Sequence, residues 1–153
     1  MKFVLNKRGI KMKKYRVGYT TGVFDMFHIG HLNILRRAKE KCDYLIVGVS
    51  TDELVMEYKN KTPIIPFEER AEIVRSIDCV DRVIAQENRD KYAAWRELKF
   101  DVMFVGDDWK GKPLFMKVEE EFKKVGVDVV YFPYTKDTSS TILREKLGAK
   151  GSL

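Results

Sequence analysis

Hydrophobic residues in this chain fall into two alternating kinds of segment. Five short runs are rich in Val, Ile, Tyr and Phe, which is typical of strands buried on both faces. Between them, apolar residues recur three or four positions apart, as on one face of a helix. This alternation predicts an α/β fold: a doubly wound, Rossmann-like, five-stranded parallel sheet with helices on both faces. The predicted strands are 15–19, 44–49, 82–85, 102–106 and 127–132.

The helical segments set the limits of the predicted domain. We expect one nucleotide-binding type of domain at 15–147, a basic N-terminal extension at 1–14 and a frayed tail at 148–153. In such a sheet, ligands bind at the carboxyl ends of the strands, so the loops that follow the strands are where chemistry is expected. The predicted helices are built on Leu32, Leu35 and Ala38, on Ala71, Val74 and Ile77, on Phe115, Val118 and Phe122, on Ile142, Leu143 and Leu147, and on the short segment 92–98.

Charge and composition narrow the class of protein. The 153 residues include 29 Lys and Arg against 23 Asp and Glu, a net charge of +6 that suits an anionic ligand. Six basic residues and no Ser lie in the first fourteen positions, which indicates a solvated extension rather than a transit peptide. No run reaches the ~18 apolar residues of a membrane helix. Cys42 and Cys79 are far apart, so reduced thiols and a cytoplasmic location are expected, without a zinc site.

The loop after the first strand holds both histidines of the chain. Gly22 would permit a tight turn, and Asp25 is a candidate helix N-cap or loop anchor. His28 and His31 are three residues apart at a helix start, so their rings should point the same way. Gly30 would let an anion approach the helix N-terminus, whose free N–H groups favour phosphate. Two surface histidines beside a cap are the alternative, but their pairing after a buried strand favours a polyphosphate site.

The segment after the second strand adds cations. Lys59 and Lys61 would act as point charges on phosphate groups from a mobile loop, and a solvated basic loop is the alternative. In the next helix, Arg70 either braces the site or pairs with Glu69. Both interpretations of Arg70 stay open at this point.

The loops after the fourth and fifth strands are polar in different ways. Gly106 precedes Asp107 and Asp108, whose carboxylates suit ribose or base contacts, or Mg²⁺ through water; a capped turn is the alternative. Residues 138–141 all carry hydroxyl groups and lead into a helix. Capping needs one or two of them, so the surplus suits phosphate oxygens.

These motifs resemble a known family. The stretch Gly22-Val23-Phe24-Asp25 followed by His28-Ile29-Gly30-His31 is similar to the cytidylyltransferase branch of the HxGH nucleotidyltransferases. The resemblance runs from about Tyr15 to Leu147 and includes Glu69-Arg70. The sequence Gly106-Asp107-Asp108-Trp109 with Gly111 is particularly similar to the bacterial glycerol-3-phosphate cytidylyltransferases.

The resemblance implies a reaction and a set of roles. A phosphorylated alcohol, glycerol 3-phosphate, would attack the α-phosphate of CTP in line and give CDP-glycerol and pyrophosphate. His28, His31 and Lys59 would be catalytic, and Mg²⁺ would bind through the triphosphate without protein ligands. A homodimer that binds small molecules, but neither nucleic acid nor membrane, is expected. The implied acceptor-binding residues are Asp52, Lys59, Lys91 and Trp109. The implied nucleotide-binding residues are Thr21, Gly22, Val23, Phe24, Asp25, His28, Gly30, His31, Lys61, Gly106, Asp107, Asp108, Thr135, Thr138, Ser139, Ser140 and Thr141.

Departures from the family leave alternatives. Asp78 and Tyr134 stand where the family usually has arginine, and Val23 stands where many members have threonine. ATP in place of CTP is one alternative, and phosphoethanolamine, phosphocholine, ribitol phosphate or a sugar phosphate are alternative acceptors. An inactive nucleotide- or nucleic-acid-binding module is another, although no basic strand is rich in the aromatic residues that stack on bases.

Overall fold

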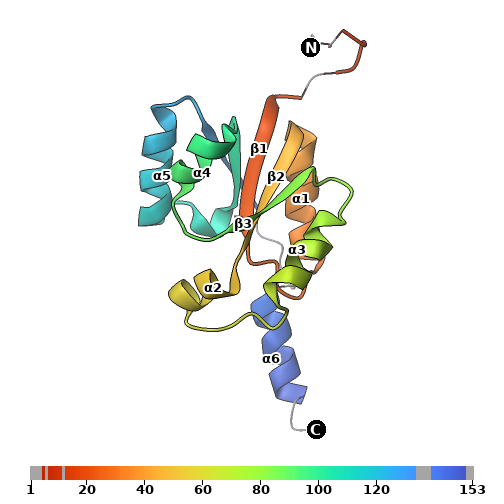
Figure 1. Ribbon diagram of the computed structural model, residues 1–153, viewed down its shortest axis with the longest axis vertical. Helices are drawn as coiled ribbons and strands as arrows, with labels where there is room; N and C mark the ends of the chain where they lie inside the picture. The colour runs from red at the N-terminus through yellow and green to blue at the C-terminus, as the bar shows by residue number, and fades with distance from the viewer. Residues whose placement is uncertain (1–4, 6, 12, 134–138, 151–153) are drawn as a thin grey trace.

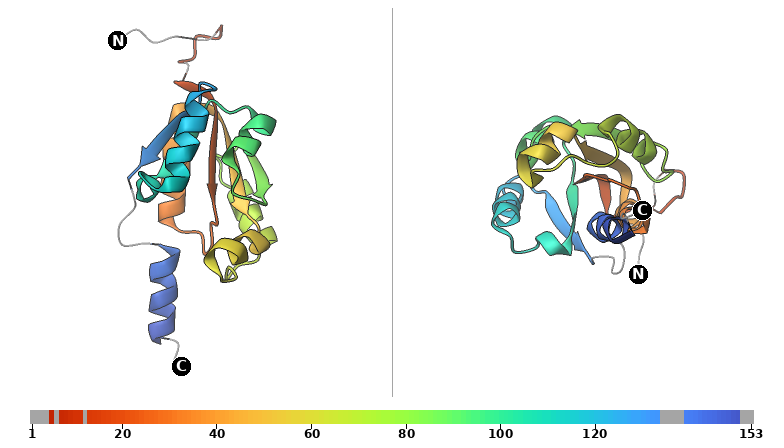
Figure 2. Two further views of the ribbon diagram at one scale, coloured as in Figure 1. Left: turned by 90° about the vertical axis from the view of Figure 1, so that its left-hand side faces the viewer. Right: turned by 90° about the horizontal axis from the view of Figure 1, so that it is seen from below.

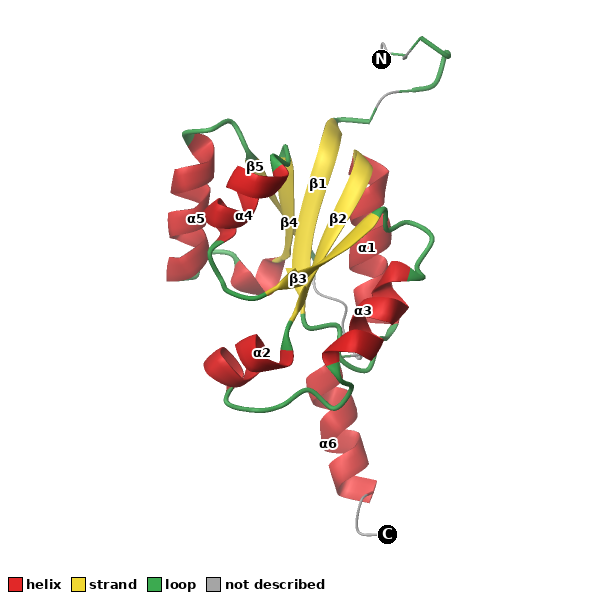
Figure 3. Ribbon diagram, in the orientation of Figure 1, coloured by secondary structure: helices red, strands yellow, loops and turns green. Residues whose placement is uncertain are grey.

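Five parallel strands form one sheet, and helices connect them (Figures 1 and 3). The computed structural model describes residues 5, 7–11, 13–133 and 139–150. The strand order is β3-β2-β1-β4-β5. The strands are β1 Tyr15–Gly22, β2 Cys42–Ser50, β3 Arg82–Gln86, β4 Val102–Gly106 and β5 Asp128–Phe132. The helices are α1 Ile29–Lys41, α2 Asp52–Lys59, α3 Phe67–Arg75, α4 Lys91–Leu98, α5 Pro113–Lys123 and α6 Ser140–Lys150, with a 3₁₀ turn η1 at Asp107–Trp109.

Each face of the sheet is covered by its own helices, as Figure 2 shows in end-on view. On one face, Leu35 and Ala38 of α1 and Val74 of α3 join a buried apolar cluster with the strands. On the other face, Phe115 and Phe122 of α5 do the same. The order of the strands reverses between β1 and β4, which is where a doubly wound sheet opens a crevice. The predicted fold class is therefore confirmed.

The main difference from the predicted elements is α2. Lys59 was expected on a mobile loop, but it is the last residue of a helix that was not predicted. Thr51 caps this helix by accepting from the Leu54 N–H, and Asn60 ends it in the left-handed conformation at φ 53°. Because the helix is two turns long and buries only Leu54 and Val55, its periodicity is too short to stand out.

The first strand begins at one predicted limit of the domain, whereas the last helix runs past the other. β1 begins at Tyr15, where the domain was expected to start. At the other end, α6 continues to Lys150, past the predicted limit at Leu147, and it extends away from the sheet (Figures 1 and 2). Among the helices of the described residues, none has the length and apolar character needed to span a membrane.

Candidate active site

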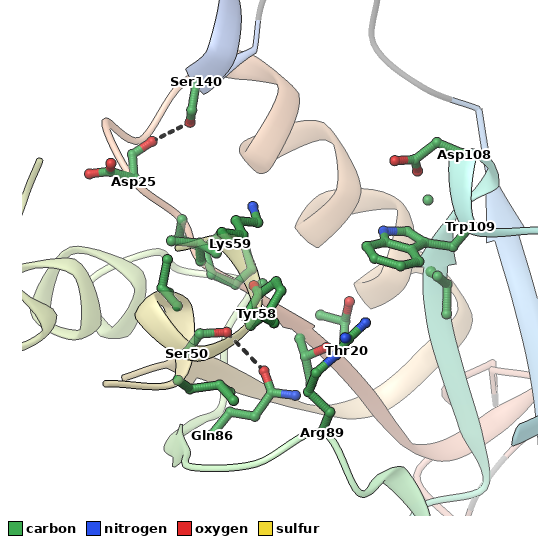
Figure 4. Close-up of a pocket in the computed structure, with 18 of the residues that line it drawn as sticks. Thr20, Asp25, Ser50, Tyr58, Lys59, Gln86, Arg89, Asp108, Trp109 and Ser140 are labelled. Carbon is green, nitrogen blue, oxygen red and sulfur yellow. Dashed lines mark hydrogen bonds between the residues drawn. The ribbon is translucent and has the colours of Figure 1, made fainter. Parts of the chain in front are cut away.

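A cavity of about 310 Å³ opens at the carboxyl ends of β1 and β4, at the point where the strand order reverses (Figure 4). Its walls come from the β1–α1 loop, α2 and the segment after it, the β3–α4 loop, the end of β4 and the start of α6. Ligands of doubly wound sheets bind at this position, so the cavity lies where the sequence predicted a site. The predicted site residues that line it are Thr21, Gly22, Val23, Phe24, Asp25, His31, Lys59, Lys61, Lys91, Gly106, Asp108, Trp109, Ser140 and Thr141.

Other predicted residues lie outside this lining. His28 stacks directly on His31, and Gly30 is buried in the first turn of α1. Asp107 is exposed in η1. Asp52 is the first residue of α2, and its carboxylate pairs with Arg70. Thr135 and Thr138, like Tyr134, are outside the described residues, so their expected roles stay predictions.

The two histidines form a reciprocal cap on α1. The His28 Nδ1 accepts a hydrogen bond from the Gly30 N–H at 3.0 Å, and the His31 Nδ1 accepts one from the His28 N–H at 3.2 Å. The two ring centroids are 3.8 Å apart. Because both Nδ1 atoms are acceptors, each neutral ring carries its proton on Nε2. The prediction that the rings point the same way is confirmed.

Burial keeps both imidazoles neutral. Burial lowers the pKa of His28, and burial followed by the proximity of His28 lowers the pKa of His31 to about 3. Each ring is thus a neutral Nε2–H donor at physiological pH. This arrangement corrects one expectation, since the Gly30 N–H is taken up by His28 and is not free to bind an anion.

The backbone of the loop between β1 and α1 is strained at two residues. Phe24 and Met26 have φ values of 55° and 48°, in the left-handed region that non-glycine residues rarely occupy. Gly22 has no positive φ; a Cβ there would lie 2.9 Å from the Phe24 ring, so glycine is needed for space. Gly22 was predicted to permit a tight turn, and the structure instead gives it this steric role.

Asp25 anchors the loop, as one of its two predicted roles required. Its carboxylate accepts from the N–H groups of Ile64 and Ile65 at 2.8 and 2.9 Å, and it pairs with Arg144 at 2.5 Å. Ser140 donates to the Asp25 carbonyl oxygen. Burial raises the pKa of Asp25, but these partners outweigh burial and hold that pKa below its ordinary value. The N-cap role belongs to His28, not to Asp25.

Arg70 braces the site from beneath. The side chain is 1% exposed and donates to the Val23 and Ser50 carbonyl oxygens at 2.6 and 2.8 Å. It pairs with Asp52 at 2.6 Å rather than with Glu69. Of the two interpretations left open by the sequence, bracing is the one that the contacts support.

Cations outnumber carboxylates among the described residues that line the cavity. Lys59 and Lys61 come from the end of α2 and the segment after it, and partial burial, then Lys61 and Arg144, lower the pKa of Lys59. Lys91 is 7% exposed, and its Nζ donates to the Thr21 hydroxyl at 3.2 Å. A triphosphate and a phosphorylated acceptor are both strongly anionic, so this lining suits them.

The row of hydroxyl residues before α6 divides its roles. Ser139 caps the helix by accepting from the Ile142 N–H at 3.0 Å. Ser140 uses its hydroxyl proton on the Asp25 carbonyl oxygen. Thr141 lines the cavity and is exposed. One residue of the described part of the row therefore caps, in line with the argument that capping does not use them all.

Two arginines of the cavity lining were missed by the sequence analysis. Arg89 lies in the β3–α4 loop and Arg144 lies in α6. The rule that directs attention to the carboxyl ends of strands applies to β3 as well, and it would have found Arg89. Asp78, which replaces a family arginine, is exposed in the segment before β3 and is not in the lining.

Comparison with known proteins places the chain in a family. The profile of the cytidylyltransferase-like family matches residues 19–146. The chain is 38% identical over 131 residues to the glycerol-3-phosphate cytidylyltransferase of Bacillus spizizenii, covering 85% of this chain and 95% of that protein. It is 37% identical over 125 residues to the FAD synthase of Thermococcus sibiricus, covering 81% and 84%. A solved lipopolysaccharide core biosynthesis protein from Thermoplasma volcanium superposes with a TM-score of 0.67 at 27% identity, covering 81% of this chain and 99% of that one. The chain therefore belongs to the cytidylyltransferase-like family.

Proposed function

We propose that this chain is a cytidylyltransferase that joins CTP and glycerol 3-phosphate, giving CDP-glycerol and pyrophosphate. The observation that carries the proposal is the stacked pair of neutral imidazoles beside a cavity lined with cations. Similarity to glycerol-3-phosphate cytidylyltransferases over most of the chain supports this acceptor.

The chemistry needs positioning and charge stabilisation rather than a covalent enzyme intermediate. The acceptor's phosphate oxygen is already an anion and attacks the α-phosphorus of CTP in line, while pyrophosphate leaves. His28 and His31 donate from Nε2 as negative charge builds on the phosphate oxygens. Lys59 and Lys61 reduce the repulsion between the two reacting anions, and Thr141 contacts the departing phosphates.

Among the described residues, a divalent cation would find few protein ligands, so the substrate would supply the others. Within the described residues, no three His, Cys, Asp or Glu side chains gather to hold a metal ion. Of the two carboxylates in the lining, Asp25 is fully engaged by Ile64, Ile65 and Arg144, which leaves Asp108. Mg²⁺ bound between Asp108 and the triphosphate would neutralise phosphate charge.

One experiment tests the function directly. Purified protein is given CTP or ATP together with glycerol 3-phosphate, phosphoethanolamine, phosphocholine, ribitol phosphate or flavin mononucleotide, with Mg²⁺, and pyrophosphate release is measured. We expect the highest kcat/KM for CTP with glycerol 3-phosphate. Without a divalent cation, we expect no pyrophosphate release. ATP is the alternative nucleotide because the identity to an FAD synthase is nearly as high. Turnover with ATP but not with CTP would contradict the proposal.

Two further properties belong to the same proposal and have their own tests. A homodimer is expected from the family resemblance, and sedimentation equilibrium measures the mass in solution. A cytoplasmic location is expected from the composition, and fractionation of cells that produce the tagged protein checks it.

A further inference from the structure

Arg89 lies between two aromatic rings at the edge of the cavity. Its guanidinium carbon is 4.8 Å from the centroid of the Tyr58 ring and 5.9 Å from that of the Trp109 ring. Figure 4 shows the side chain pointing into the cavity between them. Tyr58 comes from α2 and Trp109 from η1, so rings from two separate elements hold one planar cation.

Lys91 supplies a second cation close to Arg89 in the sequence. It is the first residue of α4, two positions after Arg89, and its ammonium group is buried against the Thr21 hydroxyl. Among the described residues, no carboxylate lies within ion-pair distance of Arg89 or Lys91. Burial, followed by the charge of Arg89, lowers the pKa of Lys91, so the two cations are close enough to repel each other. An anion bound by both would relieve this repulsion.

The position of this pair distinguishes it from the rest of the site. Asp25 and Ser140, next to the histidine loop and the start of α6, lie across the cavity from Arg89 in Figure 4. The triphosphate is assigned to that histidine side. The side with Arg89, Lys91 and Trp109 is therefore open to the other reacting anion.

We propose that Arg89, oriented by the rings of Tyr58 and Trp109, binds the phosphate group of the acceptor together with Lys91; this inference rests on the proposed function. A planar guanidinium presents two parallel N–H groups to a phosphate, and the cation–π contacts with the two rings restrict its movement. Arg89 thus selects acceptors that end in a phosphate monoester dianion.

Steady-state kinetics test the inference with a matched control. Arg89→Ala and Arg89→Lys are compared with Arg96→Ala, an exposed arginine of α4 that stacks on Tyr92 and does not line the cavity. Losing a charged hydrogen bond of this kind corresponds to about 10- to 100-fold in affinity. We expect Arg89→Ala to raise the KM for glycerol 3-phosphate by that factor and to leave the KM for CTP unchanged. Arg89→Lys should have a smaller effect, and Arg96→Ala none.

Binding of inorganic phosphate separates this inference from the proposed reaction. Calorimetric titration of the wild type with phosphate should show saturable binding that Arg89→Ala weakens and Arg96→Ala does not. If no nucleotide and acceptor pair reacts but this pattern holds, the proposed reaction fails and the phosphate site stands. An unchanged acceptor KM in Arg89→Ala, a rise in the KM for CTP instead, or no saturable phosphate binding to the wild type would each overturn the inference.

Discussion

His28 has an observed structural role and a proposed chemical role on the same ring. Its Nδ1 caps α1, while its Nε2–H remains as a donor. His28→Asn should separate the two, because asparagine is a good N-cap but has no equivalent donor at Nε2. We expect the free energy of unfolding in urea to stay within about 1 kcal/mol of wild type, and pyrophosphate release to fall by ~10²–10³. His28→Ala removes both the cap and the donor, so stability and turnover should both fall. Wild-type turnover in His28→Asn would refute the catalytic role.

Lys91 makes stability depend on pH. Burial, followed by the proximity of Arg89, lowers its pKa from 10.5 to about 8. Between these values the unfolded chain binds more protons than the folded one, so stability rises with pH. Below pH 8 both states are protonated, and the folded state bears a cost of up to roughly 3 kcal/mol. Lys91→Met should therefore raise the free energy of unfolding at pH 7 and remove the rise above pH 8, as urea titrations from pH 7 to 10 would measure.

Lys117 provides the control for this effect. It is exposed on α5, and its nearest carboxylate partner is at 4.0 Å. Lys117→Met should keep the wild-type dependence on pH. A Lys91→Met variant that is less stable than wild type at pH 7 would show that Lys91 is not a buried cation without an anionic partner.

Residue-level prediction worked where the residues that act together are close in sequence. His28 and His31 share one turn, so their spacing alone predicted that their rings would meet. The contacts of Arg89 with Tyr58 and Trp109 join the β3–α4 loop to α2 and η1. No local pattern in the sequence links these three segments. Arg144 is a similar case, since it reaches Asp25 across 119 positions. Such contacts follow from the topology of the sheet and not from any window of sequence.

At the scale of elements, Arg70 joins four separate segments around the cavity. Its guanidinium links the β1–α1 loop, the end of β2, α2 and the segment before α3. Arg70→Ala would leave the Asp52 carboxylate and buried carbonyl groups without their partner, and we expect a loss of about 3–5 kcal/mol in the free energy of unfolding. Arg75→Ala, which removes an exposed pair with Glu72, should change it little. Equal losses in the two variants would show that Arg70 is not a brace.

The elements themselves were predictable to the extent that burial imposed a pattern. All five strands were found because each has long apolar side chains against helices on both faces. The carboxyl ends of β1 and β2 lie beyond the predicted limits, since they carry Thr21, Gly22 and Ser50, polar or small residues that line the cavity. Polar or small residues at strand ends interrupt the apolar pattern, so a prediction from that pattern ends the strand too early.

On the scale of the whole molecule, Asp25 connects the sheet to a helix that stands apart from it. Its carboxylate binds Arg144 of α6 and the backbone of Ile64 and Ile65, and its carbonyl oxygen binds Ser140. In Figures 1 and 2, α6 extends beyond the layers of the domain. Stability that depends on so few contacts is local, so α6 is expected to open without unfolding of the sheet.

Hydrogen exchange in the variant Arg144→Met tests this separation. A hydrogen bond between charged groups contributes about 1.5–3 kcal/mol, so its loss should speed exchange of the α6 amides by about 10- to 100-fold. Exchange in β1, β2 and β4 should not change, because those amides open only with the whole sheet. Arg36→Met, which alters an exposed arginine on α1, is the control. Faster exchange throughout the sheet would mean that α6 is part of one cooperative unit, and the Asp25–Arg144 pair would then stabilise the entire fold rather than the placement of one helix over the active site.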